Sequence, residues 1–122
     1  MAELEFILSS GILKWNEQSY SARSGGFGKG PLPTGKYTVD VKHAVESKNL
    51  GSGFLDPLSK KRWFIPIEPD FTTDRKKLGI HPDGPPAGTE GCIGLKGASA
   101  NLFFTKWNRT SISSRPTKLT VI

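Results

Sequence analysis

The stretch of sequence that decides the fold joins two short apolar segments through a connection rich in proline and glycine. It reads Ile80-His81-Pro82-Asp83-Gly84-Pro85-Pro86-Ala87-Gly88-Thr89-Glu90-Gly91-Cys92-Ile93-Gly94-Leu95. Proline and glycine interrupt regular structure, so we expect a strand over residues 78–81, a loop, and a second strand over residues 91–95. A sharp loop of this kind brings the two ends of the stretch side by side. The sequence therefore predicts that His81 and Cys92 lie near each other.

Short β-strands are also predicted on both sides of this stretch. Apolar and β-branched residues form runs of strand length that end at turns, over residues 3–8, 12–15, 37–42, 62–67 and 117–122. The run at residues 62–67 is apolar and aromatic, which is typical of a central strand. We expect it to end at Pro66 and Pro69, because proline cannot donate a hydrogen bond within a sheet.

One helix is predicted, over residues 99–109, with Ser99 as its N-cap. The residues that follow one another at helical spacing are Leu102, Phe103, Lys106 and Trp107. The chain contains 14 glycines and 9 prolines among its 122 residues, and this excess argues against a helical bundle. We therefore predict a mainly β fold with one short α-helix, in a single domain over residues 1–122.

Composition and charge narrow the classes of function. The formal net charge of +6 favours an anionic partner, such as nucleic acid, a membrane surface or an acidic cell-wall polymer, without choosing among them. No apolar run approaches the roughly 18 residues needed to cross a bilayer, so we expect no stable membrane insertion. The first residues alternate acidic and apolar side chains, unlike a secretory signal. We expect synthesis in the cytoplasm without a signal peptide.

His81 and Cys92 are candidate catalytic residues. A thiol attacks carbonyl groups as the thiolate, and a nearby imidazole accepts its proton. Gly91 leaves room for a substrate carbonyl and lets backbone amides face a developing oxyanion. Asp83, or a backbone carbonyl near Pro82, is a candidate to orient the imidazole, and Thr89 to donate a hydroxyl within the turn. The residues alone leave open a second interpretation, with the cysteine buried in the core and the histidine in a surface loop.

The same stretch resembles the active-site signature of the L,D-transpeptidase (YkuD-type) catalytic domain. That signature is a histidine, a spacer, and then Ser/Thr-His-Gly-Cys followed by apolar residues; the matching positions are His81, Thr89, Gly91 and Cys92. Residues 20–26 and 31–37 also resemble the opening strands of small members of the superfamily. Three departures are visible: Glu90 replaces the second histidine, the spacer is shorter, and Gly94 stands where an arginine or asparagine is common.

The resemblance implies a β-sandwich or barrel and an enzyme that acts on peptidoglycan stem peptides. In this family the cysteine forms a thioester with the peptide, which an amine converts into a crosslink and water into a cleaved product. We expect an endolysin-like hydrolase of the L,D-carboxypeptidase or endopeptidase type, acting as a monomer in the periplasm or cell wall after release or injection. The alternatives are an L,D-transpeptidase and a toxic effector injected into a competing bacterium.

A non-catalytic module that binds glycan or nucleic acid is the alternative of a different class. It would use a basic cluster with Trp63 and Phe64 as stacking residues, the basic members being Lys60, Lys61, Arg62, Arg75, Lys76 and Lys77. Under the enzyme hypothesis, Arg75 and Lys76 instead bind carboxylates of the stem peptide and Trp63 lines the cleft. We expect no nucleic-acid partner and no cofactor. No metal is expected, because one cysteine and two separated histidines do not supply a tetrahedral ligand set.

Overall fold

A computed structural model describes residues 3–25, 30–84 and 92–122, and within these ranges the chain forms nine strands and one α-helix. The strands are β1 (Leu4–Ile7), β2 (Ile12–Trp15), β3 (Gln18–Ser24), β4 (Gly35–Val39), β5 (Val45–Glu46), β6 (Trp63–Pro69), β7 (Gly79–Pro82), β8 (Ile93–Leu95) and β9 (Lys118–Val121). The helix is α1 (Ala98–Arg109), and two 3₁₀ turns are η1 (Ser52–Phe54) and η2 (Ile112–Ser114). No helix in these ranges is long and apolar enough to span a membrane.

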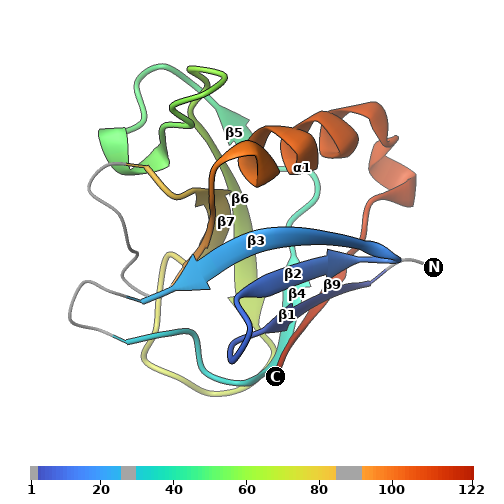
Figure 1. The fold of residues 1–122 in the computed structure, drawn as a ribbon. Coiled ribbons are helices and arrows are strands. Elements are labelled where there is room, and N and C mark those ends of the chain that lie inside the picture. The colour runs from blue at the N-terminus through green and yellow to red at the C-terminus, as the bar shows by residue number, and fades with distance from the viewer. Residues whose placement is uncertain (1–2, 26–29, 85–91) are drawn as a thin grey trace.

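Eight of the described strands close into a barrel. Their order is β4-β9-β1-β2-β3-β8-β7-β6, and the pairing of β6 with β4 completes the ring, while β5 adds to the side of β6. The helix α1 crosses over the barrel on the side of β3 (Figure 1). The predicted mainly β fold with one α-helix is confirmed, and it takes the form of a barrel rather than a sandwich.

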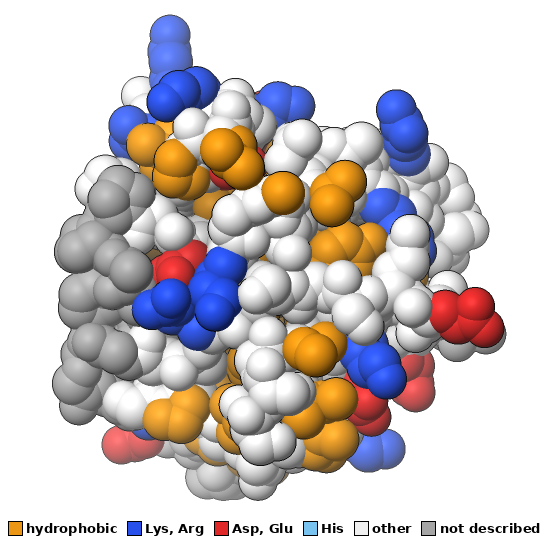
Figure 2. Space-filling model, in the orientation of Figure 1, with side chains coloured by type: hydrophobic (Ala, Val, Ile, Leu, Met, Phe, Trp, Pro, Cys, Tyr) orange, Lys and Arg blue, Asp and Glu red, His pale blue; other side chains and the backbone are white. Residues whose placement is uncertain are grey.

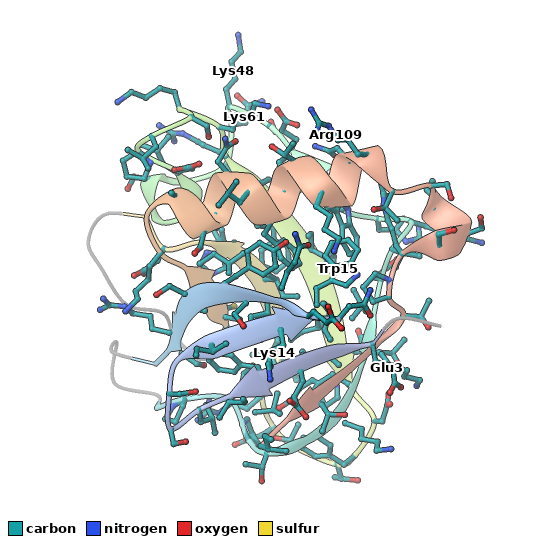
Figure 3. All side chains as sticks on the ribbon, turned by 45° about the vertical axis from the view of Figure 1, so that its right-hand side comes forward. Glu3, Lys14, Trp15, Lys48, Lys61 and Arg109 are labelled. Carbon is teal, nitrogen blue, oxygen red and sulfur yellow. The ribbon has the colours of Figure 1, made fainter. Side chains whose placement is uncertain are left out.

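The core is built from alternate residues of the strands and from one face of α1. In β1 and β2 the buried positions are Leu4, Phe6, Leu13 and Trp15. Such period-two alternation places one set of side chains inside the barrel. Trp15 lies beneath α1 (Figure 3), where its ring contacts Phe103 at a centroid distance of 5.5 Å. The helix therefore closes the aromatic part of the core.

Two predictions about the ends of elements are wrong. The N-cap of α1 is Gly97, whose φ of 53° is a conformation that glycine adopts at little cost. Ser99 lies inside the first turn, and its Oγ accepts a hydrogen bond from the Ser21 backbone N–H at 2.9 Å, which ties the helix to β3. The strand β6 runs through Pro66 and ends at Pro69, so of the two predicted ends only Pro69 is confirmed. The Pro66 carbonyl accepts a hydrogen bond from Asp40 N, where the neighbouring strand changes from β4 to β5.

The arrangement of β3, β8 and β7 positions the site. β8 lies between the other two and pairs antiparallel with β3 and parallel with β7. The register places both His81 and Arg23 opposite Gly94. Because residues directly opposite one another share a face of the sheet, these three positions form a row across the three strands.

Candidate active site

His81 lies within β7 and is almost fully buried, with 5% of its surface exposed. Its Nδ1 is 2.6 Å from the carbonyl oxygen of Pro82. A carbonyl oxygen only accepts hydrogen bonds, so Nδ1 must carry the proton of this contact. The neutral imidazole then has its lone pair on Nε2, which is the atom available to act as a base.

Aromatic rings pack against this imidazole. The ring of Phe54 lies 4.8 Å from the His81 ring between centroids, and that of Phe64 lies 6.0 Å away in a stacked arrangement. Burial lowers the pKa of His81 below its ordinary value of 6.5, while the hydrogen bond to Pro82 and the charge of Asp83 act in the opposite direction. His81 is therefore neutral at pH 7 and able to accept a proton.

Cys92 directly precedes β8 and is half-buried. Its Sγ donates a hydrogen bond to the carbonyl oxygen of Lys77 at 3.6 Å. Lys77 has a φ of 56°, an uncommon conformation for a residue with a side chain. The neighbouring core residues Ile93 and Leu95 are buried. The thiol is thus more accessible than a core position in this strand would be.

The register of β7 and β8 brings the two chemical groups to one face. Ile80 pairs with Ile93 and His81 with Gly94 in the parallel ladder, and Cys92 is two residues before Gly94. Side chains alternate along a strand, so Cys92, Gly94 and His81 share the face opposite to that of the core isoleucines. An imidazole base and a thiol on one face of adjacent strands can together carry out nucleophilic attack on a carbonyl.

The other residues predicted for the turn have different places. Asp83 Oδ2 forms an ion pair with Arg23 Nε at 2.9 Å, and its side chain is 4% exposed. The Pro82 carbonyl holds the imidazole Nδ1, so Asp83 acts on the imidazole through its charge. Thr89 and Gly91 lie outside the described residues, and their predicted roles remain predictions.

Trp63 is a core residue rather than a cleft residue. It is 0% exposed, and its ring stacks on Phe104 of α1 at a centroid distance of 4.5 Å. A side chain without exposed surface cannot contact a substrate or stack on a base, so the predicted roles of Trp63 in a cleft or in nucleic-acid binding are corrected. The period of β6 explains the placement, because Trp63, Ile65 and Ile67 all face the core.

Arg75 and Lys76 lie in the segment between β6 and β7. Together with Lys77 they line a pocket of about 310 Å³ under this segment. Cys92 does not line this pocket, although its thiol contacts the carbonyl of Lys77, which does. The predicted contact of Arg75 and Lys76 with a substrate carboxylate is compatible with this location and stays a prediction.

The comparisons with known proteins concern the fold. No family model matches the chain, and no curated protein is similar to it in sequence. Among solved structures, Bd1075 from Bdellovibrio bacteriovorus superposes with a TM-score of 0.65 at 11% identity, over 99% of this chain and 47% of that one. An L,D-transpeptidase from Mycobacterium tuberculosis gives 0.55 at 18% identity, over 99% and 57% of the two chains.

A third structure matches over nearly all of both chains. It is the catalytic domain of an L,D-transpeptidase from E. faecium acylated by ertapenem, with a TM-score of 0.54 and 15% identity, covering 99% of this chain and 96% of that domain. The chain has the L,D-transpeptidase fold. The fold that the sequence resemblance implied is therefore confirmed. The chain spans about half the length of the first of these structures.

Three residues at this site were not predicted to lie beside the catalytic pair, although Phe64 was named as a stacking residue of a binding module. Phe54 and Phe64 contact the imidazole, and Arg23 lies across β8 from it. Phe64 alternates with the core residues of its strand, a signal that places it on the outer face. For Arg23 no local signal exists, because its neighbours come from residues about 60 and 70 positions away in the chain.

Gly79 is expected to be intolerant of any side chain. A Cβ there would collide with the Phe64 ring and come within 2.8 Å of the Ile65 carbonyl oxygen. We expect Gly79→Ala to lower the free energy of unfolding by about 2–3 kcal/mol, as overpacking does in cores. Gly53→Ala is the matched control, since nothing lies within 4 Å of its Cβ position. Equal urea midpoints for the two variants would contradict the packing described here.

Proposed function

We propose that the chain is a cysteine-dependent enzyme that hydrolyses peptidoglycan stem peptides. The observation that carries the proposal is the placement of Cys92 and His81 on one face of β7 and β8, with Nδ1 of the imidazole bound to the Pro82 carbonyl. This arrangement leaves Nε2 as the base for the thiol proton. The L,D-transpeptidase fold and the net charge of +6 favour an acidic cell-wall substrate.

The reaction has two steps in this proposal. In the first, Nε2 of His81 takes the thiol proton, Sγ of Cys92 bonds to the carbonyl carbon, and the amide C–N bond breaks as the proton passes to the leaving amine. In the second, His81 takes a proton from water, whose oxygen attacks the thioester, and Sγ leaves and recovers its proton. The products are a free carboxylate, a free amine and the unchanged enzyme.

Transpeptidation is the second candidate, because two of the matching solved structures are named as L,D-transpeptidases. An amine of a second stem peptide would then replace water in the second step. We propose hydrolysis as the main outcome and the periplasm or cell wall as its place, in a phage endolysin or an injected effector. The same residues serve both outcomes.

Mass spectrometry of muropeptides tests the proposal. Purified peptidoglycan is incubated with the protein and digested to muropeptides, with the Cys92→Ala protein as control. We expect stems shortened by one residue or crosslinked dimers split into monomers, whereas transpeptidation would produce new dimers. A muropeptide pattern identical to that of the Cys92→Ala control would reject the function.

A further inference from the structure

Arg23 is on the same face of the sheet as the candidate catalytic pair. It lies directly opposite Gly94 on β8, and His81 lies opposite the same glycine from the other side. Gly94 carries no side chain. The side chains that flank it on this face are therefore the imidazole of His81 and the guanidinium of Arg23, with the thiol of Cys92 two residues earlier on β8.

An ion pair with Asp83 holds the guanidinium of Arg23 in place. Arg23 Nε is 2.9 Å from Asp83 Oδ2, and the carboxylate is 4% exposed while the arginine side chain is 43% exposed. Asp83 follows β7 and is itself fixed by a backbone hydrogen bond from its N–H to Leu95 O. Among the described residues Asp83 is the one side chain that pairs with Arg23, and it uses Nε. The two terminal NH₂ groups are thus oriented in advance for a second carboxylate.

Arg23 also lines a groove that His81 does not line. It has a volume of about 520 Å³ and is lined by a second cationic residue, Lys96, together with Ser9, Ser10 and Ser24. No acidic residue of the described ranges lines it. Figure 2 shows basic side-chain atoms gathered beside acidic ones on the surface over the end of β3. The groove thus offers positive charge and hydroxyl groups to an extended anionic ligand.

We propose that Arg23, positioned by Asp83, binds the α-carboxylate of a peptide whose scissile carbonyl lies at Cys92, and that the Arg23–Lys96 groove holds the adjoining part of that acidic peptide. This proposal rests on the proposed function, which supplies the peptide bond to be broken. It makes Arg23 a specificity-determining residue. The described counterion, Asp83, would then be a positioning residue that keeps the guanidinium aimed at the substrate.

Two synthetic tetrapeptides with an L,D bond test the proposal, one with a free C-terminal carboxylate and one with a carboxamide. Their kcat/KM values are measured for the parent protein and Arg23→Gln, and their Kd values by calorimetry for the same pair in the Cys92→Ala background. We expect the parent to prefer the carboxylate about 10- to 100-fold, as for a hydrogen bond to a charged group. Arg23→Gln is expected to bring this ratio to about one.

The controls separate recognition from folding. Arg23→Gln removes the guanidinium that pairs with the buried carboxylate of Asp83, so the double variant with Asp83→Asn is measured beside it. Lys48→Gln removes an equal charge from an exposed side chain that extends away from the barrel (Figure 3), and it is expected to keep the parent ratio. A structural role for Arg23 would lower the rates for both peptides equally and leave their ratio unchanged.

The outcomes are distinguishable. Turnover by the parent without preference between the peptides, or a preference that survives Arg23→Gln, would overturn the role of Arg23 and leave the proposed function standing. If the parent cleaves neither peptide and leaves the muropeptide pattern of peptidoglycan unchanged, while the Cys92→Ala protein still binds the carboxylate form through Arg23, the proposed function is rejected and the carboxylate site is retained.

Discussion

Replacing Cys92 with alanine is expected to abolish turnover, with a loss of at least about 10⁴-fold in kcat. The thiolate is the atom that bonds to the substrate carbonyl in the proposed reaction, and no other described residue of the site offers a comparable nucleophile. The fold is expected to survive, because the side chain is half-buried and its hydrogen bond to Lys77 O is long, at 3.6 Å. The change in the free energy of unfolding should remain within about 1 kcal/mol.

Intact-protein mass spectrometry gives the sharper readout for this variant. The parent protein, quenched in acid during turnover, is expected to carry the mass of the acyl group on Cys92, whereas the alanine variant carries none. Cys92→Ser is the matched control, because its hydroxyl keeps a donor for Lys77 O while the oxygen is a poor nucleophile without strong activation. An alanine variant that digests peptidoglycan at the parent rate would refute the assignment of the nucleophile.

Replacing His81 with alanine is expected to lower kcat/KM by about 10²- to 10⁴-fold, the usual loss of a general base. The second histidine provides a control. His43 is exposed and its Nδ1 pairs with Asp40 at 2.9 Å, with no described contact to His81 or Arg23, so His43→Ala should keep the parent rate. Similar losses for both variants, or none for His81→Ala, would contradict the assignment.

The pH dependence of the parent follows from the burial of His81. Its pKa is lowered from 6.5, so the neutral base persists below pH 6.5 and the acid limb of kcat/KM should lie below that value. The same shift contributes stability to the folded protein that is fully present above pH 6.5 and is lost as the pH falls from 6.5 through the lowered pKa, because protonation places a charge in a buried site. His81→Ala should remove this part of the acid destabilisation in urea titrations.

The location of the site along the chain could be predicted from the sequence, but the geometry of the site could not. Proline and glycine around residues 82–91 correctly separated two strands, but their parallel pairing was not foreseen, since local turn signals do not determine strand direction. Trp63 shows a different limit, because an aromatic ring suits either a core or a binding surface. Its position on the buried face of β6, stacked on Phe104 of α1, places it in the core. Arg23 was missed because its partners are distant in sequence.

Ser99 illustrates how tertiary contacts override a local preference. A serine near a helix start is a good N-cap. Here its hydroxyl instead accepts a hydrogen bond from the Ser21 N–H of β3, and Gly97 is the N-cap. The orienting group for His81 was predicted as either Asp83 or a carbonyl near Pro82, and the side-chain packing selects the carbonyl. Sequence alone leaves such choices open, because they depend on how strands from distant parts of the chain approach.

The position of β9 has a consequence for how this barrel is made. It lies between β1 and β4, in parallel register with β1, and its buried residues Leu119 and Val121 complete the wall. The first described strand, β1, therefore gains its second neighbour only when the last strand, β9, has formed. Such long-range closure slows folding and exposes strand edges during synthesis. A chain interrupted before residue 118 would leave an edge of β1 and an edge of β4 unpaired, and unpaired strand edges favour aggregation.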